Sequence, residues 1–556
     1  MKNLLRVCLS ACSITSSLAG VSQPKHDSGL PTIDLGYEIH QATFNQSGQY
    51  YNFSNVRYGA PPVGNLRFSP PTAPKKTNNP VFNDGSKAVT CIQAIPYWTA
   101  FTTAWVTNGT AAFNISAGYQ PPDITSMLPQ DPLMDEDCLF LDIMVPKKVF
   151  DSANNGPGAP VMVWIHGGGY TLGSKVLYSP SAAGLLLESE ANGSNGVIWV
   201  AMNYRLGAYG FLSGPTFTES GGTPNAGLLD QRFALEWVQR NIRKFGGDPG
   251  RVTIIGESAG GGSSMHQLTA YGGSKGSVPF QQAIIQSPRY QPMPSSKGQE
   301  AVYQKFLTDA NVKCLQEARD LTTEKLQFAN YKLVGESYPY GTFTFNPAVD
   351  GDFVPALPGA LLRKGKFDRS VHVMAGHNIL EGLEFMDPFA QTEGRFEEDL
   401  RIYFPTISND SVQHISKVLY PPVYDGRYGY SNPTGRGELM ITEGFFTCNT
   451  NWLGKALNYE TYNYIFSVYP SLHGDDIAYT YYNGPQPLVQ DDVLAITMQR
   501  YFTSFAETGS PNSAGEPYFP KYGQNTSCQN LNFVITQTKD NAANARCDWW
   551  QLGLFS

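Results

Sequence analysis

The sequence predicts an α/β fold, in which a central and mostly parallel sheet carries helices on both faces. Short, continuous runs of apolar residues recur along the chain, and such runs are typical of parallel strands buried on both faces. Helical patterns and glycine-rich turns separate these runs, as they do in a doubly wound sheet. The predicted strands cover residues 161–165, 197–201, 252–255, 283–285 and 371–375.

The composition fits a large globular protein and excludes one class of partner. The chain has 556 residues, of which 41% are hydrophobic, so it can bury a large core. Its formal net charge is −8, and no long run of lysine or arginine interrupts it. We therefore expect no nucleic-acid partner.

The amino terminus is typical of a secretory signal peptide. Lys2 and Arg6 precede a mildly apolar segment that ends in Ser-Leu-Ala, and we expect cleavage after Ala19, which makes residues 1–19 the leader. This segment is too short and too polar for a membrane anchor. Acceptor sites for N-glycosylation favour the same secreted, extracellular location. They lie at Asn45, Asn52, Asn108, Asn114, Asn192, Asn409 and Asn525.

The cysteines agree with export from the cell. An even number of them follows the leader, which predicts disulfides in an exported protein. Their spacing fits no zinc-ligand pattern, and we expect neither a metal nor an organic cofactor. The cysteines beyond the leader are Cys91, Cys138, Cys314, Cys448, Cys528 and Cys547.

The first part of the chain is broken into short pieces. Residues 30–90 alternate apolar stretches with glycine and proline, which predicts a meander of edge strands. Between Cys91 and Cys138 the sequence is irregular and aromatic. Long irregular insertions are often functional lids or binding loops, although a packed surface flap would have the same composition. Both interpretations stay open at this point.

The rest of the chain continues the α/β pattern. A helix with two adjacent apolar rows is predicted over 225–244, and a glycine-rich turn ends it before the strand at 252–255. No internal repeat or low-complexity linker divides the chain, so we expect a single domain over residues 20–556. Further helices are predicted near 394–402, 409–419 and 494–508, and a further strand at 462–469.

The strand at 252–255 leads into Gly256-Glu257-Ser258-Ala259-Gly260, and small residues that can begin a helix follow. This is a G-x-S-x-G nucleophile elbow in the strand–turn–helix context that the motif requires. Its glycines allow a sharp turn, and the serine at the tip projects its hydroxyl above the sheet. The simpler interpretation is that Ser258 only caps the helix. The context favours a catalytic nucleophile.

An α/β-hydrolase places its machinery in the chain order oxyanion loop, serine, acid, histidine. The strand at 161–165 runs into His166-Gly167-Gly168-Gly169-Tyr170. Consecutive glycines expose backbone N–H groups that can point at one oxyanion. A glycine triplet alone is a weak signal, but it is a strong one between a strand and a G-x-S-x-G motif.

Two histidines, His414 and His473, follow any plausible acid. His414 lies in a predicted helix and is expected to be structural, whereas His473 lies in a loop after a strand, where the base belongs. For the acid, Glu381 lies in the loop after the strand at 371–375. Glu384 and Asp387 are nearby alternatives, and ordinary solvation of the loop would also explain all three.

In these residues and their order, the chain resembles the type-B carboxylesterase/lipase family, which has the α/β-hydrolase fold and includes fungal lipases, carboxylesterases and cholinesterases. The similarity covers almost the whole chain after the leader. The segment from Phe245 to Gly260 matches the serine signature of the family, and 136–141 matches its second signature. Similar landmarks are 203–207, 350–351 and 505–512.

The resemblance implies a secreted serine carboxylic-ester hydrolase without cofactors, which acts on hydrophobic small-molecule or lipid esters and makes transient contact with a lipid interface. It implies Ser258 as nucleophile, Glu381 as acid and His473 as base. It implies an oxyanion hole formed by the N–H groups of Gly168, Gly169 and Ala259. It also implies a Cys91–Cys138 disulfide that closes a lid-like loop over 91–138.

The sequence departs from the family pattern at two places. Cys314 has no nearby partner, which leaves the later disulfides open, and Ser287-Pro288 stands where the family has Ser-Gly, which we expect to reshape the wall of the acyl pocket. An acyltransferase or biosynthetic tailoring enzyme of the same fold is the alternative function. A non-catalytic adhesion or binding member is less well supported, because every member of the triad is present.

Overall fold

The computed structural model describes residues 29–108, 131–153, 155–177, 181–293, 295–336, 339–390 and 392–555. The leader predicted over 1–19 lies outside the described residues, and so does much of the segment between Cys91 and Cys138.

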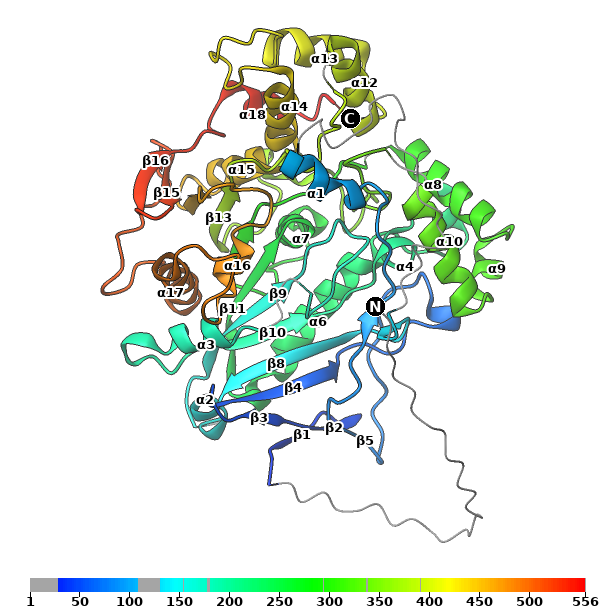
Figure 1. Ribbon diagram of the computed structural model, residues 1–556. Coiled ribbons are helices and arrows are strands. Elements are labelled where there is room, and N and C mark those ends of the chain that lie inside the picture. Colours follow the sequence, from blue (N-terminus) through cyan, green and yellow to red (C-terminus); the bar gives the residue numbers. More distant parts are fainter. Residues whose placement is uncertain are drawn as a thin grey trace, which may run out of the picture.

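The described part of the chain is built around an eleven-stranded sheet (Figure 1). A three-stranded sheet of β1 (Thr32–Asp34), β2 (Glu38–Gln41) and β5 (Val81–Asn83) lies beside it. The strands of the large sheet, in spatial order, are β16 (Thr536–Lys539), β15 (Ser527–Leu531), β14 (Tyr462–Phe466), β13 (His372–Asn378), β12 (Gln282–Gln286), β11 (Gly247–Glu257), β9 (Ala159–Ile165), β10 (Ile198–Met202), β8 (Phe140–Pro146), β4 (Tyr50–Arg57) and β3 (Thr43–Asn45).

The centre of the large sheet is parallel and its edges are antiparallel. β10, β9, β11, β12, β13, β14 and β15 pair in parallel, one with the next. β8, β4 and β3 join in antiparallel order at one edge, and β16 does so at the other. Because parallel strands end at the same edge of a sheet, the loops that follow β9, β11, β13 and β14 meet there. The predicted mostly parallel sheet is confirmed.

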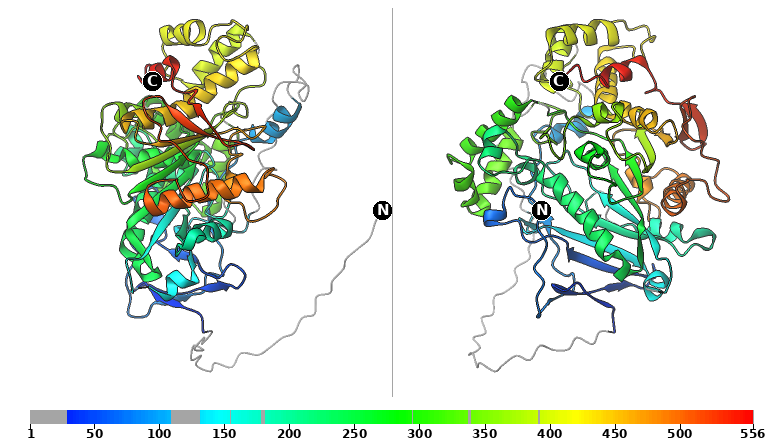
Figure 2. Two further views of the ribbon diagram at one scale, coloured as in Figure 1. Left: turned by 90° about the vertical axis from the view of Figure 1, so that its left-hand side faces the viewer. Right: turned by 180° about the vertical axis from the view of Figure 1, so that it is seen from behind.

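Helices cover both faces of the sheet, as the sequence predicts. Val161, Val163 and Ile165 of β9 pack into the core cluster that includes α6 (Ala226–Asn241) and α7 (Ala259–Leu268). The intervening Met162 and Trp164 pack into the opposite cluster, with α3 (Ala183–Ser189) and α17 (Asp492–Thr508). Figure 2 shows α17 lying along the sheet in its left view and α6 in its right view. The period of two along a strand thus divides its side chains between two cores.

Additional helices form two groups beside the sheet (Figure 1). One group is α8 (Ser296–Asp309), α9 (Leu315–Arg319) and α10 (Thr323–Glu336), and the other contains α12 (Glu393–Tyr403), α13 (Asn409–His414) and α14 (Pro433–Ile441). The helices predicted near 394–402 and 409–419 are therefore confirmed, and the second continues as a π-helix over Ile415–Leu419. Smaller helices are α2 (Lys147–Asp151), α4 (Gly207–Phe211), α5 (Pro215–Glu219), α11 (Pro358–Arg363), α15 (Cys448–Ala456), α16 (Ile477–Thr480) and α18 (Ala545–Trp550).

The structure corrects the predicted length of one strand and the predicted character of one loop. The strand predicted over 462–469 ends at Phe466, because Phe466 already pairs with the last residues of both neighbouring strands, Asn378 and Leu531. The irregular segment after Cys91 contains the helix α1 (Thr99–Asn108). Its apolar residues follow no clean helical period, although Trp105 packs into the same core cluster as α6 and α7.

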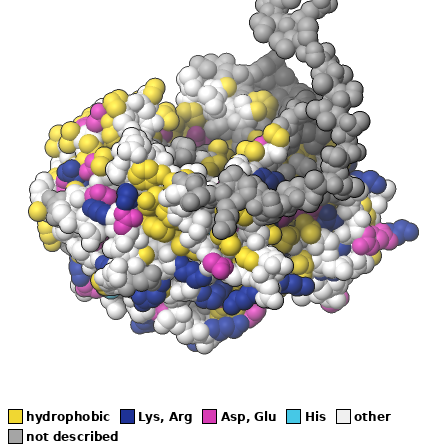
Figure 3. All heavy atoms as spheres, turned by 90° about the horizontal axis from the view of Figure 1, so that it is seen from below, with side chains coloured by type: hydrophobic (Ala, Val, Ile, Leu, Met, Phe, Trp, Pro, Cys, Tyr) yellow, Lys and Arg dark blue, Asp and Glu magenta, His cyan; other side chains and the backbone are white. Residues whose placement is uncertain are grey.

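Two disulfides tie distant parts of the chain together. One joins Cys91 to Cys138, and the other joins Cys448 of α15 to Cys547 of α18. Cys314, which is exposed, and Cys528, which is buried, are free thiols. On the face seen from below Figure 1, acidic and basic side chains lie among apolar ones (Figure 3). Among the described helices, none is long and apolar enough to cross a membrane.

Candidate active site

Ser258 occupies a strained turn between β11 and α7. Its φ is 58° and its ψ is −121°, a conformation that costs a non-glycine residue about 1–3 kcal/mol. Glycine is required on both sides, because a Cβ on Gly260 would lie 1.9 Å from the carbonyl oxygen of Ile165, and one on Gly256 would lie 2.5 Å from Gly260. The Ser258 side chain makes no capping hydrogen bond to α7. The interpretation of Ser258 as a helix cap is therefore wrong.

The glycine loop after β9 presents backbone N–H groups beside this turn. Gly168 and Gly169 have φ values of 104° and 59°, and a Cβ at either position would collide with Leu172 or Phe343. Their N–H groups donate no hydrogen bond to any residue that the structure describes. The N–H group of Ala259 begins α7, where no intrahelical acceptor exists. All three donors are free for an oxyanion.

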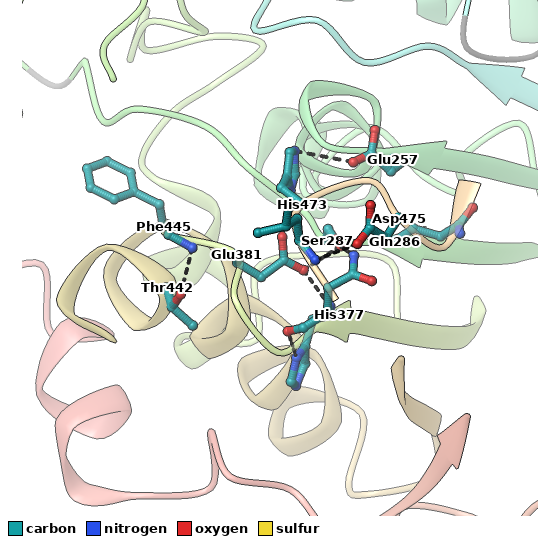
Figure 4. Close-up of polar contacts among 12 residues, drawn as sticks. Glu257, Gln286, Ser287, His377, Glu381, Thr442, Phe445, His473 and Asp475 are labelled. Carbon is teal, nitrogen blue, oxygen red and sulfur yellow. Dashed lines mark hydrogen bonds and ion pairs between the residues drawn. The ribbon is translucent and has the colours of Figure 1, made fainter. Parts of the chain in front are cut away.

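Glu381 and His473 meet across the loops that follow β13 and β14 (Figure 4). The Nδ1 atom of His473 lies 2.5 Å from Oε2 of Glu381. The other carboxylate oxygen of Glu381 accepts hydrogen bonds from the Ser287 hydroxyl and the Asn378 N–H group, both at 2.6 Å. Burial alone would raise the pKa of Glu381, but the charge of His473 and these hydrogen bonds outweigh it and lower that pKa. Glu381 is therefore held as a carboxylate.

The alternative acids and the alternative base make no contact with the Nδ1 atom of His473 or with Ser258. Asp387 pairs with Arg395, and Glu384 lines the cavity without a hydrogen bond to His473 or to any other described residue. His414 stacks on Trp549 at a ring-centroid distance of 5.5 Å and so has a structural environment. Of the three candidate acids, Glu381 is the one that contacts Nδ1 of His473, and His414 contacts none of them.

Glu257, which sequence analysis missed as a site residue, faces the other side of the imidazole (Figure 4). Its Oε1 atom lies 3.2 Å from Nε2 of His473, without the geometry of a hydrogen bond. Burial and the neighbouring Asp476 and Glu381 raise the pKa of Glu257 to about 8, against the charge of His473. The available signal was its position next to the nucleophile in the motif.

Carboxylates dominate the electrostatics of His473. Burial would lower its pKa, but Glu257 and then Glu381 outweigh burial and raise that pKa to about 9. Ser258 and His473 make no hydrogen bond to each other in the structure. Catalytic hydrogen bonds are often long before substrate binds, so this geometry is compatible with proton transfer in a complex.

Ser258, His473, Gly168 and Gly169 all line one cavity of about 620 Å³. The first half of the aromatic segment after Cys91 also reaches it, through Trp98 and residues 99, 102 and 103. The other lining residues include Leu172, Glu257, Phe343, Glu384, Phe385, Asp475, Ile477, Tyr481, Gln486 and Leu488.

Trp98 anchors this segment at the cavity wall. Its indole N–H donates to the carbonyl of Thr342 at 2.8 Å, and its ring packs on Phe343 and Phe385 at 5.5 and 5.7 Å between centroids. The described part of the segment therefore lies at the cavity, as the binding-loop interpretation requires and the surface-flap interpretation does not.

The Ser287-Pro288 pair, which we expect to reshape the wall of the acyl pocket, does not itself line the cavity. Ser287 donates to Glu381, and the Pro288 carbonyl accepts a hydrogen bond from Asn449 at 2.9 Å. Gly261 of α7 approaches Pro288 so closely that a Cβ there would lie 2.9 Å from its Cα. Ser287 thus holds the carboxylate of Glu381 in place, and Pro288 packs against the helix that follows the nucleophile elbow.

The predicted glycosylation sites differ in exposure. Asn409 and Asn525 are exposed. Asn45 and Asn52 are half-buried, and their amide groups donate to Tyr50 and Ser54. Asn114 and the side chains of Asn108 and Asn192 lie outside the described residues. Within the described chain, no three His, Cys, Asp or Glu residues are placed to hold a metal ion.

Comparison with known proteins gives consistent matches. The carboxylesterase family model matches residues 38–550. The chain is 40% identical to Carboxylesterase patB of Aspergillus clavatus and 41% identical to that of Penicillium expansum, in each case over 94% of this chain and 96% of the relative. It is 32% identical to Lipase 1 of Geotrichum candidum over 84% and 85% of the two chains. EstA of Aspergillus niger has a similar structure, with a TM-score of 0.77 at 24% identity over 94% of this chain and 98% of EstA.

Proposed function

The chain belongs to the carboxylesterase family and is a carboxylic-ester hydrolase, and on this premise we propose that Ser258, His473 and Glu381 hydrolyse hydrophobic esters through an acyl-enzyme. The observation that carries this proposal is the 2.5 Å contact of His473, which lines the same cavity as Ser258, with a buried Glu381 that accepts two further hydrogen bonds. No other described carboxylate contacts Nδ1 of His473.

In the proposed reaction, Nε2 of His473 takes the proton of the Ser258 hydroxyl as its oxygen attacks the ester carbonyl. Glu381 keeps the imidazole in the tautomer that accepts at Nε2 and stabilises the imidazolium that forms. His473 then protonates the leaving alcohol. Water, deprotonated by the same nitrogen, hydrolyses the acyl-enzyme and restores Ser258.

The N–H groups of Gly168, Gly169 and Ala259 are proposed to bind the oxyanion of the tetrahedral intermediates. Backbone donors that are already in place cost no reorganisation during the reaction, and each contributes about 3 kcal/mol to the transition state. The support for this role is the absence of other acceptors for Gly168 and Gly169 among the described residues.

We also propose that the protein is secreted. The leader-like start, the acceptor sequences for glycosylation and the two disulfides all favour the secretory route. The chain is 33% identical to a Secreted lipase of Arthroderma benhamiae and 28% identical to the Secreted triacylglycerol lipase LIP1 of Gibberella zeae. Detection of the processed and glycosylated chain in culture medium tests this point.

The cavity favours hydrophobic esters, because Trp98, Phe343, Phe385 and Leu172 form much of its wall. A series of p-nitrophenyl esters and triacylglycerols of increasing acyl length measures the preference directly. Release of free acid in every productive reaction supports hydrolysis. Accumulation of an acyl-enzyme that only a second alcohol or amine discharges would instead support an acyltransferase.

Replacing Trp98 by alanine is expected to change substrate preference. Loss of the indole removes part of the cavity wall, so kcat/KM should fall about tenfold for long or aromatic acyl groups and less for acetate. The matched control is Trp105→Ala, since Trp105 is equally buried and bonded to the Leu383 carbonyl but does not line the cavity. Both variants lose stability. Equal effects of the two on preference would contradict a role of this segment in binding.

Replacing Glu257 by glutamine is expected to shift the pH profile. Neutral His473 is the active form, and the Glu257 carboxylate favours the protonated form. Removal of this charge lowers the pKa of His473, so the acid limb of kcat/KM should move to lower pH by about one unit or more. The pH dependence of p-nitrophenyl acetate hydrolysis measures it. An acid limb that stays in place would show that Glu257 does not interact with the base.

A further inference from the structure

Arg289 is a buried cation without a carboxylate partner. Its residue is 3% exposed, and it forms no ion pair with any residue that the structure describes. One guanidinium nitrogen, Nη2, donates to the Gly341 carbonyl at 3.0 Å, while Nε donates to nothing. The titratable groups that face it are the phenols of Tyr170 and Tyr403. Burial of an unpaired charge is costly, so a role for it is expected.

Phenyl rings surround the guanidinium instead. Its carbon lies 4.7 and 4.6 Å from the ring centres of Phe343 and Phe385, and 5.6 and 5.7 Å from those of Phe445 and Phe446. Such contacts attract a cation to the faces of the rings. Because Phe343 and Phe385 line the cavity, the guanidinium lies directly behind the cavity wall.

The same rings connect Arg289 to the base. Phe385 and Phe446 lie 5.2 and 4.7 Å from the His473 ring, centre to centre. The main chain of Arg289 also supports the elbow, because its N–H group donates to the Ser258 carbonyl at 2.9 Å. A single residue thus contacts the elbow, the cavity wall and the rings that hold the imidazole.

The charge of Arg289 is the opposite of the charges around His473. The imidazole faces Glu257 at the end of β11 and Glu381 and Glu384 on the loop after β13, while Asp475 and Asp476 follow it on its own loop. No lysine or arginine lines the described cavity. The guanidinium carbon and the imidazole each lie about 5 Å from the centre of Phe385, so about 10 Å at most separates them. At that distance, across a wall of apolar side chains that exclude water, a unit charge is expected to shift the pKa of the imidazole.

We propose that Arg289 is a positioning residue of this site, which holds the rings of Phe343 and Phe385 in place and sets a positive charge behind His473. The rings define the space open to the acyl group. The charge opposes the surrounding carboxylates and so favours the neutral imidazole that catalysis requires. This proposal rests on the proposed function of His473 as the base.

Two variants separate the two contributions. Arg289→Met removes the charge and keeps a long side chain, and Arg289→Lys keeps the charge but loses the planar group that covers the rings. For each, kcat and KM are measured against pH with p-nitrophenyl acetate, and kcat/KM at one pH is measured over acyl chains of increasing length. Enzyme concentration is fixed by titration with a fluorophosphonate, so that misfolded protein is not counted.

We expect the acid limb of kcat/KM to move to higher pH by about one unit in R289M and to stay in place in R289K. Both variants should change the ratio of long-chain to acetate kcat/KM by several-fold. An unmoved limb in R289M, or an equal shift in R289K, would overturn the role of the charge. An unchanged chain-length ratio in both would overturn the role in placing the rings.

The proposal remains testable if a variant does not fold. If R289M does not fold, Arg289→Gln replaces it, because glutamine can still donate to the Gly341 carbonyl. If neither neutral variant folds, the chain-length ratio in R289K decides the proposal. Failure of the proposed function is distinguishable. It would appear as retained hydrolysis after His473→Ala, which none of these outcomes affects.

Discussion

Replacing Ser258 by alanine is expected to abolish ester hydrolysis, with a loss in kcat on the order of 10⁶-fold. Alanine removes the hydroxyl that is proposed to form the acyl-enzyme and leaves Cβ in place, so the φ of 58° and the hydrogen bond from the Ser258 N–H group to Gln286 can persist. The variant should therefore fold like the wild type. Initial rates with p-nitrophenyl acetate, together with the melting temperature, measure both expectations.

Ser264→Ala is the matched control, because Ser264 is also a buried serine of the same region, on α7, where its hydroxyl bonds the Gly260 carbonyl at 2.9 Å. It should lose a small amount of stability and keep most of its activity. Retention of more than a few per cent of activity in Ser258→Ala, with contaminating esterases excluded, would remove Ser258 from the role of nucleophile.

Glu381→Gln is expected to lower kcat by about 10⁴-fold, which is the scale seen when the acid of a serine triad becomes an amide. The amide keeps the shape of the carboxylate but loses the charge that stabilises the imidazolium, and it can present an N–H group to Nδ1 in place of an acceptor. The control is Glu384→Gln on the same loop, which makes no hydrogen bond to His473 and should have a mild effect.

Kinetics at several pH values separate loss of catalysis from a shifted pKa. Because Glu381 and Glu384 both raise the pKa of His473, both variants should move the acid limb of kcat/KM to lower pH, but only Glu381→Gln should lower the plateau. A larger loss of plateau activity in Glu384→Gln would show that the acid is misassigned.

Most of the fold could be predicted from the sequence, because the central strands are short, apolar on both faces and separated by glycine-rich and polar turns. The run at 161–165 is an example, since all of β9 is buried between two helical layers and needs no alternation of polar residues. Prediction was weaker at boundaries that neighbours decide. β11 begins at Gly247, before the apolar run, because Gly247 pairs with Ala159 across a break in register.

The candidate site could be predicted only for residues that a sequence motif or the chain order of the triad identifies. Ser258, Glu381 and His473 follow predicted strands, so their positions could be inferred from chain order. The contact of Glu257 with His473 depends on the approach of the end of β11 and the loop after β14, which are more than two hundred residues apart. Arg289 carries no motif of its own. Its surroundings arise from rings in separate segments, which no local pattern of the sequence brings together.

The central claim, that Ser258 forms the covalent intermediate, is tested most directly by labelling the purified protein with a fluorophosphonate and locating the adduct by peptide mass spectrometry. Attack by the serine oxygen on phosphorus displaces fluoride, so this account predicts one phosphonyl group per chain, on Ser258, and none after Ser258→Ala. Labelling should slow at low pH as His473 becomes protonated. An adduct on another residue, or an active enzyme that takes up no label, would contradict the account.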